Sequence, residues 1–282
     1  ESVVADAREG IEELQSALQA RGWHTEWSNE VPDAKRLWQT ELTRLTQLES
    51  PEAKALNQTR VLMELNELLR EDNIVAASGS LPSDLERIWT ARRPGAYHLE
   101  YGFSCMGYEI SGALGVKLAD PDREVYSFVG DGGFLMGHSD LLTSIQEGHK
   151  INVLLFNNSG HQCIHNLERS QGMGTFGTEF RFREQSTGGL TGSYVPVNYS
   201  ELASAYGAKT WRVTTLAELH AAIEASKQAD VSTLIEIMVL PGTMTEGYEN
   251  FWRVGTAAVS EKESVRKAYK KLNDVVKNLR KY

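Results

Sequence analysis

The chain has 282 residues, of which 41% are hydrophobic and 24% are charged, a balance typical of a soluble globular protein. Its formal net charge of −9 at pH 7 argues against a nucleic-acid partner, because a phosphate-binding surface needs an excess of Lys and Arg. No apolar run approaches the roughly 20 residues of a membrane-spanning helix, so we expect no membrane association. The first residue is Glu1 rather than Met, and we expect a piece of a longer chain or a processed product.

Cysteine is rare in this chain. The two cysteines, Cys105 and Cys163, are typical of reduced thiols in a cytoplasmic protein. Cys163 and His165 lack a second ligand pair at metal-binding spacing, so we expect no zinc site around them.

The first 50 residues have apolar positions at helical spacing but too few of them to build a core. The pattern predicts one helix over 3–20 and a second helix that opens near Pro32. We interpret residues 1–50 as the C-terminal tail of a preceding domain plus a connector, with a boundary near Ser50.

Residues 51–240 alternate between helical and strand-like segments. A helix over 52–70 comes first, and a helix that opens at Thr215 lies near the end. Short apolar runs predict strands at 74–77, 125–129, 152–156, 209–213 and 233–239. This rhythm predicts an α/β fold, with a doubly wound, mainly parallel six-stranded sheet and helices on both faces. We interpret residues 241–282 as a C-terminal arm and a helix that begins at a capping box, Ser260 to Glu263.

Two of these strands are followed by polar side chains at the point where each strand stops. Asp131 follows the strand at 125–129, and Asn158 follows the strand at 152–156. Neighbouring parallel strands end on the same edge and lie roughly 4.8 Å apart, so the two side chains should converge. Their oxygens, with the Gly160 carbonyl as a third, are hard ligands that suit Mg²⁺.

Small residues surround these ligands. Gly130, Gly132 and Gly133 leave room for a bulky anion to reach backbone amides, and the helix after them points its amino end at the same place. Gly79 and Ser80 follow another strand and could also face a phosphate. The pattern predicts a diphosphate bridged to the chain by a divalent metal.

The spacing of these residues resembles a known signature. Gly130-Asp131-Gly132, followed 25 positions after Gly132 by Asn157-Asn158, is similar to the motif of thiamine-diphosphate-dependent enzymes. The resemblance implies thiamine diphosphate and Mg²⁺ as cofactors, with Asp131, Asn158 and the Gly160 carbonyl on the metal. The alternative is a Gly-rich turn and an Asn-rich turn in an ordinary doubly wound domain.

A second segment supports the same resemblance. In these enzymes a Gly-rich turn precedes a large apolar residue, a glycine and a helix, and Met106-Gly107 matches that order. The resemblance implies that Met106 wedges between the two rings of the cofactor, and that the Ser104 carbonyl accepts a hydrogen bond from the aminopyrimidine. Read without the motif, Met106 is a core residue.

Residues 161–197 hold many glycines and few apolar runs, so we expect a long irregular loop that forms a wall or a lid of the active site. His161, Gln162 and His165 are candidates to face the cofactor or substrate. The alternative for each histidine is a loop residue that bonds to backbone.

Within the family, two strings point to one branch. NNSGHQCIHNL after the metal motif and GYENFWRVG near the end are similar to hydrolases of myo-inositol catabolism that cleave a C–C bond of a cyclic 1,2-diketone. Carboligases related to acetolactate synthase carry a proline in the helix after the Met-Gly pair. Here that helix reads GYEISGALG, which favours the hydrolases.

The resemblance also implies missing parts. The family uses a glutamate from an N-terminal pyrimidine domain, of the same or a neighbouring subunit, to activate the cofactor, and no acidic residue here matches that motif. We therefore assign no catalytic acid in this chain and expect a homodimer or homotetramer acting on a small cyclic diketone. Two alternatives remain open: a cofactor-binding module that is inactive alone, and an unrelated α/β nucleotide binder.

Overall fold

The computed structural model describes residues 3–49, 54–244, 255–277 and 279. The chain separates into two compact units, residues 1–44 and residues 45–282. The domain boundary predicted near Ser50 falls outside the described residues and stays a prediction.

The first unit contains α1 (Ala7–Ala20) and most of α2 (Glu30–Thr46), close to the two predicted helices. Asp6 caps α1 by accepting hydrogen bonds from the backbone N–H groups of Arg8 and Glu9. None of the residues of α1 is buried, so this helix rests on local bonding rather than on packing.

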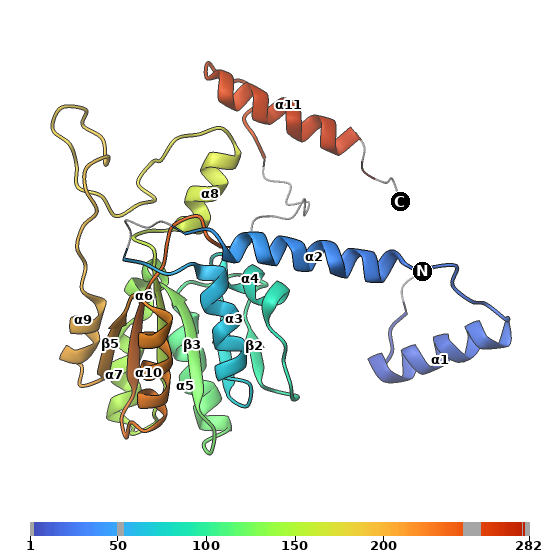
Figure 1. Cartoon of the computed structure of the whole chain (residues 1–282), viewed down its shortest axis with the longest axis horizontal. Coiled ribbons are helices and arrows are strands. Elements are labelled where there is room, and N and C mark those ends of the chain that lie inside the picture. Colours follow the sequence, from blue (N-terminus) through green and yellow to red (C-terminus); the bar gives the residue numbers. More distant parts are fainter. Residues whose placement is uncertain (1–2, 50–53, 245–254, 278, 280–282) are drawn as a thin grey trace. The chain divides into compact units, whose positions relative to one another are not determined.

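The second unit is built on a six-stranded sheet in the order β2-β1-β3-β4-β6-β5, and every neighbouring pair is parallel (Figure 1). The strands are β1 (Asn73–Ala76), β2 (Tyr97–Leu99), β3 (Val125–Gly130), β4 (Asn152–Asn157), β5 (Lys209–Val213) and β6 (Thr233–Met238). The predicted parallel sheet is confirmed. The edge strand β2 was not predicted, because three half-buried residues are too short to show a period.

Helices cover both faces of this sheet, as predicted (Figure 1). One face packs against α3 (Gln58–Leu68), α4 (Leu81–Ile88) and α10 (Leu216–Lys227). The other face packs against α5 (Tyr108–Ala119), α6 (Asp131–Gly137), α7 (Ser139–Gln146) and α9 (Tyr199–Ala205). Alternate strand residues supply the two cores: Leu154 and Phe156 point into the first, and Val153 and Leu155 into the second.

The strand order reverses between β1 and β3. The chain passes from β1 outward to β2, then returns through α5 to the other side of β1 and continues to β4. Open α/β sheets bind ligands outside the carboxyl ends of their strands at such a reversal. We therefore expect the ligand site of this fold at the turns that follow β1, β3 and β4.

Two local predictions were wrong. The segment after Gly160 is not irregular throughout, because α8 (Gln162–Ser170) forms at once and buries Gln162 and His165. Ser260 does not cap the last helix, α11 (Glu263–Lys277); its hydroxyl accepts from the N–H of Lys262 instead.

The predicted C-terminal arm is described only in part. Residues 245–254, which include most of the GYENFWRVG string, lie outside the described residues. Of the neighbouring residues, Thr243 accepts a hydrogen bond from the backbone N–H of Gln58 at 2.9 Å, which attaches residues after β6 to the start of α3.

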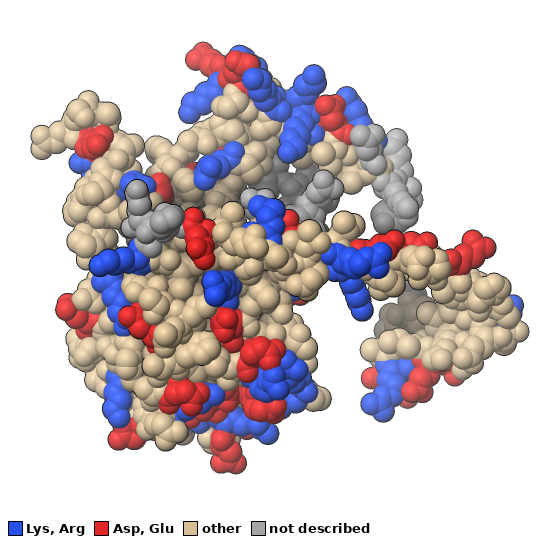
Figure 2. All heavy atoms as spheres, viewed as in Figure 1, with Lys and Arg blue, Asp and Glu red and all other residues tan. Residues whose placement is uncertain are grey.

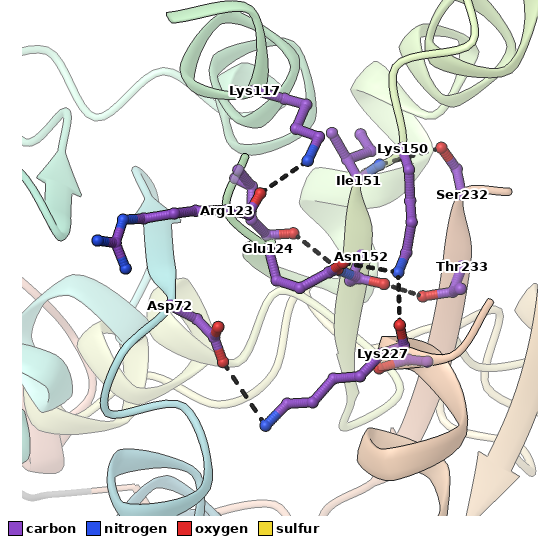
Figure 3. Close-up of polar contacts among 12 residues, drawn as sticks. Asp72, Lys117, Arg123, Glu124, Lys150, Ile151, Asn152, Lys227, Ser232 and Thr233 are labelled. Carbon is purple, nitrogen blue, oxygen red and sulfur yellow. Dashed lines mark hydrogen bonds and ion pairs between the residues drawn. The ribbon is translucent and has the colours of Figure 1, made fainter. Parts of the chain in front are cut away.

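The amino edge of the sheet carries a polar network whose members bond to one another (Figure 3). The buried amide of Asn152 donates to Glu124 at 2.6 Å, and its oxygen accepts from the hydroxyl of Thr233 at 2.7 Å. Lys150 donates to Glu124 at 2.9 Å and to the carbonyl of Lys227 at 3.3 Å. The polar groups of this network are hydrogen-bonded to one another, so we assign the amino edge of the sheet a structural role, which is to join neighbouring strands.

The surface carries charged side chains of both signs, as expected from a chain in which 24% of the residues are charged. Acidic and basic side chains are interspersed over the lower half of Figure 2, where the sheet and its helices lie. Within the described residues, no helix has both the length and the apolar character that crossing a bilayer requires.

Candidate functional site

The turns after β3 and β4 meet at one buried carboxylate. Asp131, the first residue of α6, is fully buried. One of its oxygens accepts from the backbone N–H of Gly132 and the other from the N–H of Gly160, each at 2.9 Å. The structure thus brings together Asp131 and Gly160, two of the three predicted metal ligands.

Burial makes the charge on this carboxylate costly. Desolvation raises the pKa of Asp131 to about 7, although the N–H groups of Gly160 and Gly132 act in the opposite direction. A cation next to Asp131 would favour its ionised form. The buried Asp131 carboxylate is therefore suited to bind a cation, because a bound cation would compensate its negative charge.

Asn158, the third predicted ligand, has an unsatisfied oxygen. The residue is 8% exposed, and its side-chain oxygen is buried without a hydrogen-bond partner in the protein. Buried acceptors are nearly always paired, so an orphaned one calls for a ligand. A carboxylate and an amide oxygen suit Mg²⁺, which fills its remaining positions from water and phosphate. Among the described residues no group of three or more His, Cys, Asp or Glu could hold a metal.

The Asn157–Gly160 turn has a strained backbone held by a buried acid. Ser159 adopts a left-handed conformation with φ +60°, and its N–H donates to the side chain of Asn157 at 3.1 Å. The amide of Asn157 donates in turn to Glu236, a fully buried residue of β6, at 2.8 Å. Glu236 also accepts from the hydroxyl of Ser200 at 2.9 Å.

The glycines after β3 are not equivalent. A Cβ on Gly130 would meet open space, which fits the predicted room for an anion. A Cβ on Gly132 would overlap the ring of His161, so Gly132 makes room for that histidine. His161 packs edge-to-face on Phe180, with ring centroids 5.3 Å apart. A Cβ on Gly133 would lie 3.1 Å from a methyl group of Val129.

The loop that carries Met106 lies beside the same turns. The hydroxyl of Ser104 donates to the carbonyl of Ala77, which follows β1, at 3.5 Å. Gly107 has φ +95°, and a Cβ on Gly137 would come within 2.7 Å of its Cα, so this loop contacts the end of α6. Met106 is 37% exposed, which does not support the alternative that it is a core residue.

The remaining predicted residues divide into two groups. Gly79, with φ +80°, and Ser80, the residue before α4, follow β1 at the reversal of strand order. Gln162 and His165 are buried: Gln162 donates to the carbonyl of Asn158 at 3.2 Å, and His165 lies 3.4 Å from the hydroxyl of Thr178. Gln162 therefore helps to hold the turn after β4, whereas the His165 ring lies against side-chain hydroxyl groups rather than the backbone that the alternative expected.

Two buried acids were missed by the sequence analysis. Glu109 and Glu236 are both fully buried, and both bond to turns at this edge. A signal was present in each case, because a single charge interrupts an apolar stretch: YEISGALG in α5 and TLIEIM in β6.

Open α/β domains bind their ligands at the carboxyl edge where the strand order reverses. Here Asp131 follows β3 at that edge, and the unsatisfied oxygen of Asn158 follows the neighbouring strand β4. By fold and site the chain is thus an α/β domain of the diphosphate-binding class. Residues 77–237 match the family model described as "Thiamine pyrophosphate enzyme, C-terminal TPP binding domain". The chain belongs to this family.

Curated relatives narrow the comparison. The chain is 47% identical to the 3D-(3,5/4)-trihydroxycyclohexane-1,2-dione hydrolase of Clostridium tetani, over 99% of this chain and 47% of the relative. It is 48% identical to the hydrolase of the same name from Geobacillus thermodenitrificans, over 99% of this chain and 47% of the relative. It is 49% identical to a third, from Bacillus cereus, over 95% of this chain and 45% of that protein. The chain therefore spans just under half the length of these relatives.

Solved structures agree on the fold. The thiamine diphosphate-dependent 4-hydroxybenzoylformate decarboxylase of Rhodococcus jostii matches with a TM-score of 0.55 and 21% identity, over 69% of this chain and 34% of that one. The benzoylformate decarboxylase of Polynucleobacter necessarius matches with a TM-score of 0.55 and 19% identity, over 70% and 35% of the two chains. At these identities the likeness extends to the fold alone.

Proposed function

We propose that this chain is the cofactor-binding part of a thiamine-diphosphate- and Mg²⁺-dependent hydrolase that cleaves a C–C bond of a cyclic 1,2-diketone. The observation that carries the proposal is the buried Asp131 carboxylate, bonded to Gly160 and followed on the next strand by the orphaned oxygen of Asn158. The identity of 47–49% to trihydroxycyclohexane-1,2-dione hydrolases supports the substrate class. The reaction would open trihydroxycyclohexane-1,2-dione to 5-deoxyglucuronate in myo-inositol catabolism, in the cytoplasm.

The chain's own residues would bind and orient the cofactor. The side chains of Asp131 and Asn158 and the carbonyl of Gly160 would hold Mg²⁺, and the open space at Gly130 would admit the diphosphate. Met106, which is exposed on its loop, would pack between the two rings of the cofactor. Thiamine diphosphate, when bound, supplies the electron sink for breaking a bond next to a carbonyl.

The activating acid and the rest of the active site would come from an N-terminal pyrimidine domain of the same or a neighbouring subunit, within a homodimer or homotetramer. Two observations support this. The chain spans 45–47% of the relatives' length, and the buried acids at the site, Asp131, Glu109 and Glu236, all have structural bonds to backbone or side chains of this domain.

Calorimetric titration of the 282-residue chain with thiamine diphosphate, with and without Mg²⁺, tests cofactor binding. We expect binding that needs the metal; binding of equal strength without Mg²⁺, or none with it, would contradict the proposal. Hydrolysis of the dione, assayed with and without the N-terminal half of the Clostridium tetani relative, tests the reaction. Turnover only in the presence of that half is the expected result.

A further inference from the structure

We propose that Glu109 is a positioning residue that holds three of the four cofactor-binding loops in place relative to one another: the turn after β1, the Met106 loop and the turn after β3. The inference rests on the proposed function, because those loops carry the residues assigned to the cofactor. It concerns a residue that touches neither metal nor diphosphate in the proposed arrangement.

Glu109 joins two loops by direct hydrogen bonds. One oxygen accepts from the backbone N–H of Ser78 at 3.0 Å and from its hydroxyl at 2.6 Å. The other oxygen accepts from the backbone N–H of Gly107 at 2.8 Å. Ser78 directly precedes Gly79 and Ser80, and Gly107 directly follows Met106, so one carboxylate ties the turn after β1 to the Met106 loop.

The third loop is held by contact. A Cβ added to Gly133 would lie 3.6 and 3.8 Å from the two carboxylate oxygens of Glu109, which places the carboxylate against the first turn of α6. That turn begins with Asp131, two residues earlier. The carboxylate of Glu109 therefore lies among three of the four loops that supply predicted cofactor ligands, at the reversal of strand order between β1 and β3; the fourth loop follows β4.

The position of Glu109 in its helix makes a buried charge tolerable. It is the second residue of α5, which begins at Tyr108, and the amino end of a helix favours a negative group. Its three donors come from backbone and hydroxyl groups, so no basic side chain competes for the carboxylate. Because both oxygens of the carboxylate accept hydrogen bonds from ordered donors, the side chain has one orientation, and a residue that positions loops needs a fixed orientation.

A comparison within the chain separates positioning from ordinary stabilisation. Glu124, the residue before β3, is also a carboxylate that accepts from two side chains, those of Lys150 and Asn152 at the start of β4, but it lies at the amino edge of the sheet (Figure 3). Loss of either network should weaken the fold. Only loss of the Glu109 network should change how the folded chain binds its cofactor.

The test uses Glu109→Gln in the 282-residue chain, with Glu124→Gln as the matched control. The amide of glutamine turns a donor toward either Ser78 or Gly107, so one of the two loops loses its bond. At saturating Mg²⁺ and a temperature where both variants are folded by circular dichroism, we expect thiamine diphosphate to bind Glu109→Gln about 10–100-fold more weakly, the usual effect of losing a group that orients ligands. Glu124→Gln should bind within twofold of the unchanged chain.

A second variant covers the case in which Glu109→Gln does not fold. Ser78→Ala removes only the hydroxyl donor and should weaken cofactor binding about tenfold, the low end of the range for one hydrogen bond to a charged group. Folded Glu109→Gln with unchanged affinity, or, if it is unfolded, Ser78→Ala with unchanged affinity, overturns the inference and leaves the proposed function standing. Absence of Mg²⁺-dependent binding in the unchanged chain overturns both.

Discussion

The carboxylate of Asp131 and the backbone N–H of Gly160 are joined by a hydrogen bond of 2.9 Å across 29 positions of the sequence. Because each residue follows a strand of the same parallel pair, this bond fixes the distance between the turns after β3 and β4. The proposed metal would lie against these turns, so its ligands are arranged before it binds. Preorganisation of this kind lowers the cost of binding.

Asp131→Asn should remove Mg²⁺-dependent binding of thiamine diphosphate while the chain stays folded. A neutral amide keeps the shape of the side chain but not the charge that Mg²⁺ requires, so we expect affinity to fall at least about 100-fold. The fold should lose only about 1–2 kcal/mol, because the asparagine amide can accept from only one of Gly132 and Gly160. Calorimetry and urea unfolding measure the two effects, and unchanged metal-dependent affinity would refute the ligand assignment.

The side chain of Asn157 should stabilise the fold, because it bonds both to a buried acid and to the turn after β4. Asn157→Ala takes a donor from the buried Glu236 and an acceptor from the N–H of Ser159, which should cost about 2–4 kcal/mol. Asn157→Asp should cost more at pH 7, because it places a second carboxylate against Glu236 inside the protein. Urea unfolding ranks the two variants. An aspartate variant as stable as the alanine variant at pH 7 would show that Glu236 does not hold the turn.

Much of this site follows from sequence because its ligands directly follow strands. The buried runs that form β3 and β4 are continuous and apolar, and the Asp and Asn that end them are separated by a fixed crossover. Parallel pairing then requires Asp131 and Asn158 to lie on one edge. No information beyond the period of the strands and the spacing of the two motifs is needed for that step.

The rest could not be predicted from local pattern. Glu109 reaches Ser78, 31 positions earlier, and Asn157 reaches Glu236, 79 positions later, and neither pairing leaves a trace in nearby residues. The helix α8 was missed because the glycines that follow it suggested an irregular loop throughout. Its burial of Gln162 and His165 depends on the tertiary structure around them.

Gly132 and His161 should be coupled. Gly132→Ala places a methyl group where the His161 ring lies, so the ring must move, and overpacking of this kind costs about 1–3 kcal/mol. In a His161→Ala background the same change should cost at least about 1 kcal/mol less, because the space is vacant. A double-mutant cycle by urea unfolding measures the difference, and additive effects of the two changes would contradict the packing.

Asp72 should make the chain less stable as pH rises. Burial is the main cause that raises the pKa of Asp72 above its usual 3.8; Glu124 acts in the same direction, and the Lys227 ammonium, 3.7 Å away (Figure 3), acts against it. The folded state therefore holds this proton at pH values where the unfolded chain has released it. The stability that Asp72 contributes is present below about pH 3.8 and is lost as pH rises through the higher folded pKa.

Asp72→Asn, which is neutral at every pH, should remove this loss. Its unfolding free energy relative to the unchanged chain should rise as pH increases above about 3.8 and level off once the pH exceeds the folded pKa of Asp72, as measured by urea unfolding from pH 4 upward. Asp230→Asn is the control of opposite sign, because a hydrogen bond from Lys209 lowers the pKa of that exposed carboxylate below its usual 3.8. The contribution of Asp230 is lost only as pH falls below about 3.8, so the relative stability of this variant should stay nearly constant from pH 4 upward. A relative stability of Asp72→Asn that stays flat or falls over this range would show that burial does not govern the ionisation of Asp72.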